Sequence, residues 1–230
     1  MRLHDWSGFT ALGAIVASLV ELVRGDLGNA LAWLVLAVAL GVVTRYWSVT
    51  RRGPMPHRLR WTLLVPRGNQ SSAHLHRILE PRPGERLLEI GPGIGIHAVP
   101  VASSVRPDGR LDVFDVQQAM LDDLMQRART AGLTNVTPQR GEASTLPYGD
   151  GTFDGAYLVG VLGEIPDELQ ALRELRRVLK PTGRLVIGEV FFDPDFVRFG
   201  ALTARAAEAR FAFERKLGSS LSYLARFRPM

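Results

Sequence analysis

The chain has 230 residues, a formal net charge of +5 and no cysteine. This length suffices for one α/β domain of roughly 150–180 residues and a further element. The lack of cysteine excludes a disulfide framework and a thiolate metal site, and the five histidines show no metal-ligand spacing on one helix. Apart from Lys180 and Lys216 the basic residues are arginines, and no nucleic-acid motif accompanies them. We therefore expect neither a metal nor a nucleic acid as partner.

Residues 6–47 differ in composition from the rest of the chain. Trp6–Val23 is apolar apart from Ser, Thr and the acid Glu21, and Leu27–Trp47 is more strongly apolar. Each run has the length of the roughly 20 helical residues that cross a bilayer core. The runs predict an N-terminal transmembrane helical hairpin over residues 1–50. A pair of buried core helices is the alternative, which the lack of a polar stripe disfavours.

Arginines gather after the second run, at positions 45, 51, 52, 58, 60 and 67. Because positive flanks stay on the cytoplasmic side, the rest of the chain is predicted to be cytoplasmic, below a two-helix multi-pass anchor in the cell membrane. The pairs Ala14/Ser18 and Ala37/Gly41 have small-xxx-small spacing, which lets helices approach closely. The same spacing suits a homo-oligomer formed through the transmembrane helices.

Residues 51–80 are predicted to form a basic amphipathic linker and lid. In Thr50–Gln70 the arginines interleave with Met55, Leu59 and Trp61. This mixture suits an element that lies on an anionic headgroup layer, and a solvated basic face is the alternative. Ser72–Leu79 is predicted to be a short helix.

The stretch Arg86–His97 predicts a strand, a glycine turn and a helix. The strand ends at Glu89 and Ile90, and glycines at 91, 93 and 95 follow. Glycine lets the backbone turn sharply and approach a ligand, because no Cβ intervenes. A tight strand-to-helix connection without a ligand is an equal alternative for this stretch alone.

The next acid favours a ligand. Asp115 stands at the end of a second predicted strand, where an acidic side chain of a doubly wound sheet accepts hydrogen bonds from ribose hydroxyls. The alternative role of Asp115 is to cap the helix that begins near Gln117. Glu89 would repel a pyrophosphate, so the pattern favours a cationic or amino-bearing ligand over a dinucleotide.

Four motifs in order resemble those of class I S-adenosylmethionine-dependent methyltransferases, including quinone and phospholipid methyltransferases. They are Leu87–Ala102, Val113–Leu121, Gly141–Ala143 with Leu146–Asp154, and Leu172–Val186. The resemblance runs from about Pro54 to the C-terminus and implies S-adenosylmethionine as cofactor. It implies that the methionine part is lined by Glu89, Gly91, Gly93 and Gly95. It also implies that Asp115 binds the ribose, with Val116 and Met120 beside the adenine. Glu142 stands where the family usually has Asp and would bind the adenine amino group, with Ala143 as a backbone donor.

The order of elements predicts a doubly wound α/β fold with a seven-stranded Rossmann-like methyltransferase sheet over residues 81–230. Strands are expected near 86–90, 110–114, 136–139, 154–159 and 184–190, and helices near 95–104, 117–131, 167–179 and 200–209. A closing hairpin is expected from Phe211–Lys216 and Ser222–Phe227. Its antiparallel strands complete the sheet that the resemblance implies.

The methyl acceptor is expected to lie beside the fourth and fifth strand ends and the lid. Glu164 is the candidate catalytic residue, and capping of the following helix is its equally weighted alternative. The other candidate acceptor-binding residues are His57, Trp61, Gly163 and Phe191. Phe191 and Phe192 suit a pocket wall or the core, and the core is favoured.

We therefore expect a membrane-anchored methyltransferase that acts on a lipophilic small molecule or a lipid, with membrane lipids as further partners. Candidate acceptors are a phospholipid amine, an isoprenoid quinone precursor and a hydrophobic phenol. The alternative is a non-catalytic S-adenosylmethionine-binding sensor that acts through membrane partners.

Overall fold

The computed structural model divides the chain into two compact units, Met1–Arg52 and Gly53–Met230. The structure describes residues 4–50, 52–64 and 70–230, and in the first unit it describes side chains for residues 13–46 and 52. Arg51 and Arg67, both part of the predicted basic lid, lie outside the described residues. From Gly53 on, the described part of the lid belongs to the same compact unit as the sheet.

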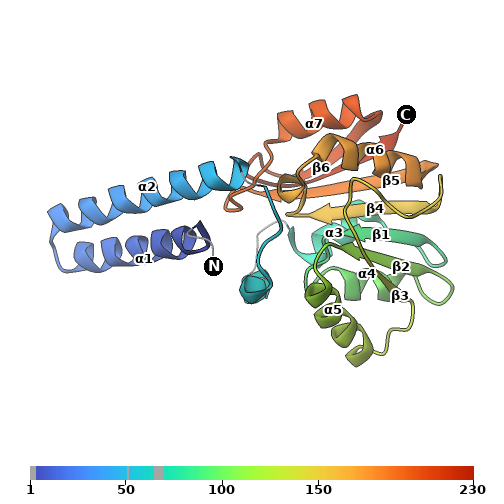
Figure 1. The fold of residues 1–230 in the computed structure, drawn as a ribbon, viewed down its shortest axis with the longest axis horizontal. Coiled ribbons are helices and arrows are strands. Elements are labelled where there is room, and N and C mark those ends of the chain that lie inside the picture. Colours follow the sequence, from blue (N-terminus) through green and yellow to red (C-terminus); the bar gives the residue numbers. More distant parts are fainter. Residues whose placement is uncertain (1–3, 51, 65–69) are drawn as a thin grey trace. The chain divides into compact units, whose positions relative to one another are not determined.

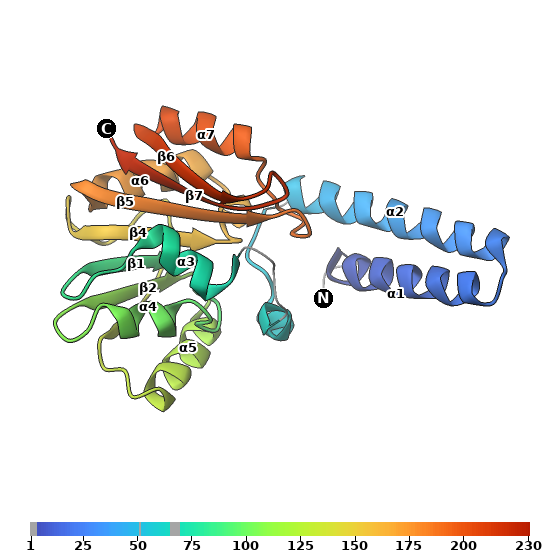
Figure 2. The same cartoon turned by 180° about the vertical axis from the view of Figure 1, so that it is seen from behind.

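The first unit is a pair of helices, α1 (His4–Val23) and α2 (Leu27–Thr50), which lie side by side in both views (Figures 1 and 2). A turn at Gly25, with φ of +80°, connects them. Asp26 accepts a hydrogen bond from the Asn29 backbone N–H at 3.0 Å, which satisfies a free donor at the start of α2.

Small residues line the contact between α1 and α2. Ala14, Ala30 and Ala37 are buried, and Ser18 Oγ donates to the carbonyl oxygen of Ala30 at 2.8 Å. Gly41 is exposed, so only Ala37 of its predicted pair takes part. Of the two predicted pairs of small residues, Ala14 and Ser18 both lie in the helix contact, whereas only Ala37 of the second pair does.

One helix of the described residues is long and apolar enough to cross a membrane. This is the 20-residue stretch Leu27–Tyr46 of α2, whose most apolar 18-residue window is 11% buried, and in α1 the described apolar stretch is Gly13–Val23. The predicted helical hairpin is therefore present as secondary structure. Two membrane crossings remain a prediction.

The second unit contains the predicted seven-stranded sheet. Its strands are β1 (Arg86–Ile90), β2 (Arg110–Asp115), β3 (Val136–Arg140), β4 (Phe153–Val159), β5 (Leu179–Val190), β6 (Phe211–Gly218) and β7 (Ser222–Pro229). The spatial order is β3-β2-β1-β4-β5-β7-β6. Strands β1 to β5 pair in parallel, and β7 runs antiparallel to β5 and β6. The predicted α/β fold with its closing hairpin is confirmed.

Helices cover both faces of this sheet (Figure 1). They are α3 (Ser72–Leu79), α4 (Ala98–Ser104), α5 (Gln118–Thr130), α6 (Glu168–Val178) and α7 (Phe199–Glu208). The neighbours Leu87 and Leu88 are both fully buried but belong to different hydrophobic clusters, because successive side chains of a strand point to opposite faces. One cluster includes α3, α4 and α5, and the other includes α6 and α7.

Two element boundaries differ from the prediction by three residues or more. The helix expected near 95–104 begins at Ala98, because Gly95 has a φ of +83° and the chain is still turning. The strand expected near 184–190 begins already at Leu179, which pairs with Phe153 before a register shift. An irregular pairing of this kind has no periodic signal in the sequence.

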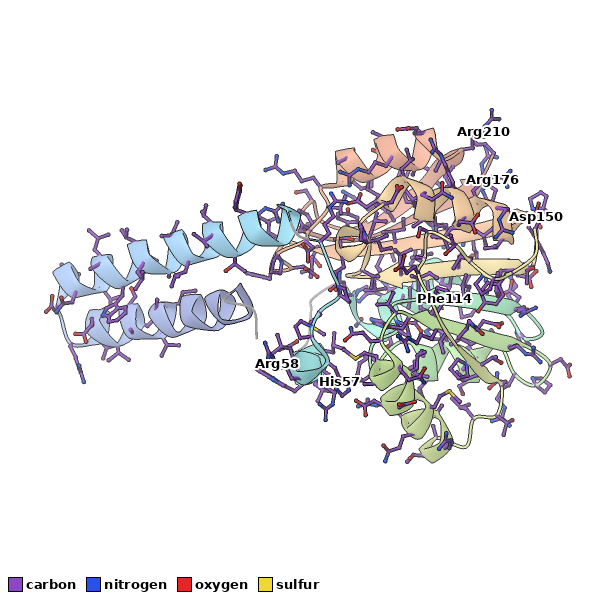
Figure 3. The ribbon with its side chains drawn as sticks, viewed as in Figure 1. His57, Arg58, Phe114, Asp150, Arg176 and Arg210 are labelled. Atoms are coloured by element: carbon purple, nitrogen blue, oxygen red, sulfur yellow. The ribbon has the colours of Figure 1, made fainter. Side chains whose placement is uncertain are left out.

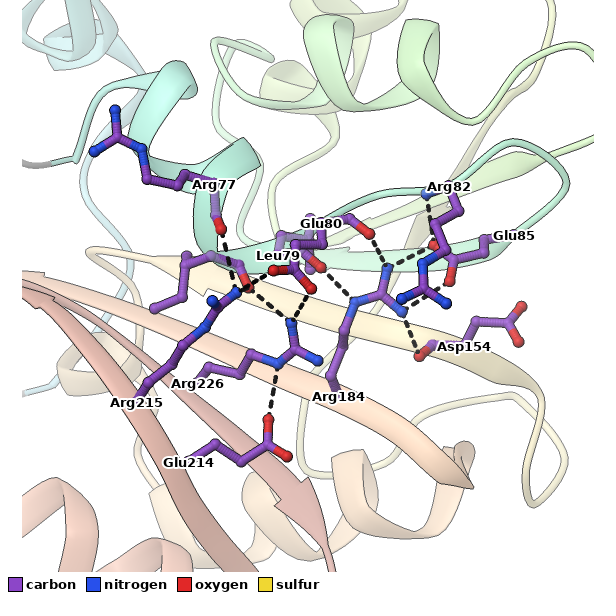
Figure 4. A network of polar contacts seen from close by, with 11 residues as sticks. Arg77, Leu79, Glu80, Arg82, Glu85, Asp154, Arg184, Glu214, Arg215 and Arg226 are labelled. Atoms are coloured by element: carbon purple, nitrogen blue, oxygen red, sulfur yellow. Dashed lines mark hydrogen bonds and ion pairs between the residues drawn. The ribbon is translucent and has the colours of Figure 1, made fainter.

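An arginine–carboxylate network joins α3 to the strands at the amino end of the parallel sheet (Figure 4). Arg184 of β5 donates to Glu85 Oε1 at 2.8 Å and to the Glu80 carbonyl oxygen at 3.0 Å, and also to the Leu79 carbonyl oxygen. Arg215 and Arg226 bind the Glu80 carboxylate from the hairpin strands. Only 10% of the Arg184 side chain is exposed, against 15% for Glu85.

We expect Arg184→Met to lower the free energy of unfolding by about 3 kcal/mol, because it leaves the mostly buried Glu85 carboxylate without its ion-pair partner, with only the Arg82 backbone N–H still bonded to it. Arg82→Met is the matched control, since that guanidinium is exposed, and it should change stability by about 0.5 kcal/mol or less. Denaturant unfolding of the detergent-solubilised chain measures both. Equal effects of the two substitutions would contradict a stabilising role of the network.

Candidate functional site

The carboxyl ends of the parallel strands gather the polar residues that the sequence singled out. Glu89 lies at the end of β1 and Asp115 at the end of β2, and both are buried. Glu164 follows β4 in the short 3-10 helix η3 (Leu162–Glu164), and Glu189 lies near the end of β5. In open α/β sheets this edge is where ligands bind.

The turn after β1 depends on its glycines. Gly91, Gly93 and Gly95 all have positive φ, a region that disfavours other residues. A Cβ on Gly91 would lie 2.5 Å from Val161 Cγ2, and one on Gly93 would lie 2.7 Å from Leu63 Cδ1. The turn is therefore packed closely between the loop after β4 and the lid.

Glu89 is a buried acid with one direct partner. Tyr157 donates its hydroxyl to Glu89 Oε2 at 2.8 Å from the neighbouring strand, where the two residues lie directly opposite each other. Burial raises the pKa of Glu89 to about 8, although the Tyr157 hydrogen bond opposes this shift. Without a ligand the Glu89 carboxyl is therefore protonated at neutral pH. A cation beside it would favour the carboxylate.

Asp115 sits across the glycine turn from Glu89. Its Oδ1 accepts from the Gln117 backbone N–H at 2.8 Å. Burial raises the pKa of Asp115, and hydrogen bonds from the backbone N–H groups of Gln117, Val116 and Gly93 oppose this shift. Gln117 is the N-cap residue of α5, so Asp115 braces the turn but is not the cap. The predicted capping role is wrong in that respect.

The residues predicted around an adenine lie beside the end of β2. Val116 is 38% exposed and Met120 is buried. Gly141 donates its backbone N–H to the Asp115 carbonyl oxygen at 3.0 Å, which brings Glu142 and Ala143 next to β2. Glu142 is exposed and Ala143 is buried. The geometry gathers all four at one wall, and their binding role remains a prediction.

The lid crosses the carboxyl edge through the backbone of Met55. Its N–H donates to Glu164 Oε2 at 3.2 Å, and its carbonyl oxygen accepts from Gln117 Nε2 at 2.9 Å. Since Gln117 also binds Asp115, the lid is hydrogen-bonded to both walls of the site.

Two predicted acceptor-binding residues lie on the α5 side of the lid, in the 3-10 helix η1 (His57–Leu64). His57 Nε2 lies 2.8 Å from Asp123 Oδ2, and Arg60 Nε lies 3.0 Å from the same oxygen. Figure 3 shows His57 beside α5. Trp61 lines a surface cavity of about 920 Å³ between η1, the glycine turn and α5. The structure thus does not bring His57 and Trp61 together with Glu164.

Glu164 is partly buried and has no part in helix capping. Asp167 is the N-cap of α6 and accepts from the Gln170 backbone N–H at 2.9 Å, so the alternative role of Glu164 is wrong. Burial, and then the charge of Asp193, raise the pKa of Glu164 well above its usual range. A Cβ on Gly163 would lie 1.9 Å from the Asp195 carbonyl oxygen, so glycine is required there for close packing.

The favoured assignment of Phe191 and Phe192 to the core is wrong. Phe191 is 53% exposed and Phe192 is 90% exposed. The core role is taken instead by Phe196, which is buried and packs its ring 5.9 Å from that of Phe191. The residues follow the buried second part of β5, residues 183–190, and hydrophobicity alone does not reveal that the chain leaves the core at that point.

Tyr157 and Gln117 are site residues that the sequence did not reveal. Tyr157 sits in an apolar strand and looks like an ordinary core aromatic, because its contact with Glu89 depends on strand register. Gln117 lies directly after the acidic motif, but its bond to Met55 joins segments 62 residues apart. Neither contact could be predicted from the neighbouring residues in the sequence.

Comparison with known families agrees with this geometry. The profile of the ubiE/COQ5 methyltransferase family matches residues 70–194, which include the glycine turn and the four acids at the strand ends. The chain belongs to the ubiE/COQ5 methyltransferase family. The family that its motifs resemble is thereby confirmed.

Individual ubiE/COQ5 relatives are similar over part of their length. The 2-phytyl-1,4-naphtoquinone methyltransferase of Synechococcus elongatus is 38% identical over 128 residues, which are 52% of this chain and 55% of the relative. The demethylmenaquinone methyltransferase of Bacillus cytotoxicus is 31% identical over 110 residues, 48% of this chain and 46% of the relative. The chain thus spans about half the length of the curated relatives it matches.

A solved structure shares the fold. The structure of an S-adenosylmethionine-dependent methyltransferase from Aquifex aeolicus superposes with a TM-score of 0.69 at 19% identity, covering 76% of this chain and 98% of that one. The predicted Rossmann-like methyltransferase sheet is therefore confirmed for the second unit.

We expect the stability of the ligand-free protein to depend on pH through Glu89. Its pKa is about 8 in the folded state against 4.5 as the ordinary value, so the folded state binds more protons between these values. The stability contributed by this group is fully present below its ordinary pKa and is lost as the pH rises through about 8, by on the order of 5 kcal/mol in total. Glu89→Gln should remove this loss, because the amide stays neutral.

Thermal unfolding at pH 5 and pH 8.5 measures this prediction. The difference in melting temperature between Glu89→Gln and wild type should grow with pH in favour of the variant. A difference that stays constant across this range would show that Glu89 is already ionised in the ligand-free fold.

Proposed function

We propose that this chain is an S-adenosylmethionine-dependent methyltransferase that acts on a lipophilic, quinone-like acceptor at a membrane. The observation that carries the proposal is the pair of buried acids, Glu89 and Asp115, on either side of a glycine turn, within the segment that matches the ubiE/COQ5 family. The methyltransferase fold of the whole second unit supports it.

The residues present fit the cofactor. Glu89 provides a buried carboxyl whose preferred partner is a cation, which suits the ammonium of the methionine part. Asp115 provides a carboxylate for the ribose hydroxyls, and the backbone N–H groups of Gln117, Val116 and Gly93 fix its orientation. Val116, Met120, Glu142 and Ala143 would surround the adenine. Gly91, Gly93 and Gly95 would let the backbone approach without side chains in the way.

S-adenosylmethionine supplies, when bound, a methyl group activated by a sulfonium charge. With the cofactor bound, an acceptor atom would form a bond to the methyl carbon as the carbon–sulfur bond breaks, and the electron pair of that bond would stay on sulfur. A phenolic or hydroquinone acceptor also loses a proton. The residues of this chain would align the two reactants, and the lid would exclude water. One side chain would accept the proton.

We assign to Glu164 the role of accepting the proton that the acceptor loses. It lies after β4, at the same edge as Glu89 and Asp115, and one of its oxygens accepts from the Met55 backbone. Its raised pKa brings it closer to that of a phenol, which favours proton uptake at the moment of transfer. Gln at this position would keep the hydrogen bond from Met55 but would not take up a proton.

The lipophilic acceptor is supported by two independent facts. The curated relatives named above methylate demethylmenaquinone or 2-phytyl-1,4-naphtoquinone according to their names. The chain also carries a stretch of membrane-spanning length in α2. We extend this to a two-helix anchor, α1 and α2, with the second unit in the cytoplasm, where the cofactor is made.

Purified full-length protein should transfer labelled methyl from S-adenosylmethionine to a membrane quinol in a lipid extract. Asp115→Ala should weaken cofactor binding by about 1.5–3 kcal/mol, because hydrogen bonds to a charged group are lost. Glu164→Gln should leave cofactor binding unchanged and lower turnover by about 100-fold or more. Scintillation counting of extracted lipid measures transfer, and calorimetry measures binding.

The outcomes separate the possibilities. Cofactor binding without transfer to any lipid fraction would indicate a sensor rather than an enzyme. No binding of S-adenosylmethionine or its demethylated product would refute the methyltransferase assignment. A Glu164→Gln variant with normal turnover would remove Glu164 from the mechanism while leaving the activity in place.

Reporter fusions should place the turn between α1 and α2 opposite to the second unit. We expect a fusion after Leu27 to report the outer side of the membrane and a fusion after Arg52 to report the cytoplasm, because arginines crowd the second flank. Extraction of the full-length protein by alkaline carbonate would contradict a spanning anchor.

A further inference from the structure

Two loops at the carboxyl edge of the sheet present large apolar side chains to solvent. Phe191 and Phe192 follow β5, and Leu221 lies in the turn between β6 and β7; their exposed fractions are 53%, 90% and 56%. The Phe191 backbone N–H donates to the Leu221 carbonyl oxygen at 2.7 Å, which joins the two loops. We call these three residues the apolar tip.

The backbone below the apolar tip is held by buried contacts. The Val197 N–H donates to Glu189 Oε2 at 3.1 Å, and Tyr223 donates its hydroxyl to the Val197 carbonyl oxygen at 2.6 Å. The Phe196 N–H donates to the Asp193 carbonyl oxygen at 3.0 Å. The outward direction of Phe192 is therefore set by a fixed loop that has already placed a different phenylalanine in the core.

A cluster of exposed large apolar residues indicates a surface that is covered in use. Three side chains are far fewer than the roughly 20–30 residues a side of a stable protein–protein interface. They suit the headgroup and acyl boundary of a bilayer, where burying an aromatic side chain is favourable and no matched partner surface is needed.

The chain connection places a bilayer within reach of this edge. Met55 is hydrogen-bonded to Glu164 at the carboxyl edge, and five residues lead back from Met55 to Thr50, the last residue of α2. Five residues span at most about 18 Å. If the Leu27–Tyr46 stretch crosses the membrane, the edge that carries the apolar tip is tethered close to the headgroups.

We propose that the apolar tip, Phe191, Phe192 and Leu221, inserts into the lipid interface and orients the carboxyl edge of the sheet toward the bilayer. This rests on the proposed function in one respect: the acceptor is then delivered from the lipid phase to the edge where Glu164 lies. The occupant of the surface is lipid and not a second copy of this chain.

Site-directed spin labelling tests the tip directly, because the chain has no cysteine and each added one is the only label site. Full-length Phe192→Cys and Leu221→Cys proteins, labelled and reconstituted into phosphatidylcholine–phosphatidylglycerol vesicles, should be accessible to oxygen and protected from a water-soluble nickel complex. Asp150→Cys is the control, since its side chain is 81% exposed and Figure 3 shows it at the end of the sheet away from His57.

Equal nickel accessibility at positions 192, 221 and 150 would overturn the proposal. Dipolar broadening at position 192 that disappears on dilution with unlabelled protein would also overturn it, because the tip would then contact a second copy. Neither measurement requires methyl transfer, so failure of the proposed function does not affect the result.

A functional readout is independent of the label. Phe192→Asp should lower turnover on a vesicle-embedded quinol by about tenfold or more, the factor that corresponds to losing one inserted aromatic. Phe192→Trp should keep the wild-type turnover on the embedded quinol, since Trp favours the membrane interface. Both variants should bind S-adenosylmethionine as wild type does, and both should act normally on a water-soluble short-chain quinol. Wild-type turnover of Phe192→Asp on embedded quinol would refute a role of the tip in acceptor delivery.

Discussion

Burial of carboxyl groups at one edge of the sheet is the constraint on which the site depends. Glu89, Asp115, Glu164 and Glu189 all have a raised pKa, and in each case burial is the largest cause. Parallel strands produce this arrangement because their carboxyl ends meet at the same edge. Buried acids without cations are costly as carboxylates, so the ligand-free site favours their protonated forms. A ligand with an ammonium and a sulfonium charge reverses that preference, which is a physical reason for this fold to select a cationic cofactor.

The lid makes this burial possible. Met55 is hydrogen-bonded to Gln117 on one wall and to Glu164 on the other, and Leu63 packs on the glycine turn. The bond between His57 and Asp123 holds the same segment against α5. Met55 and Leu63, which follow α2 in the chain, therefore form one side of the candidate site. Within the described part of the linker, the basic residue Arg60 contacts α5, and the apolar residue Leu63 contacts the turn.

Much of the fold could be predicted from the sequence, since alternating apolar residues and glycine turns give the strands, their order of appearance and the positions of Glu89 and Asp115. The contacts that complete the site could not be predicted, because they depend on register and on loop direction. Tyr157 reaches Glu89 only because the two strands pair at that register. Phe191 and Phe192 look like core residues in a sequence. The loop that turns them outward is held by the hydrogen bond from Val197 to Glu189, a contact that the sequence does not predict.

Lid position and proton occupancy are linked at Glu164. With the lid in place, burial raises the pKa of this group, and the hydrogen bond from Met55 only partly opposes the shift. Any opening that admits water lowers the pKa toward its ordinary value. By linkage, loss of the proton then favours the open lid, and the protonated acid favours the closed one. If Glu164 takes the proton of the acceptor, it therefore reaches its protonated form with the lid closed. Release of that proton to water then coincides with opening, when product and spent cofactor have to leave.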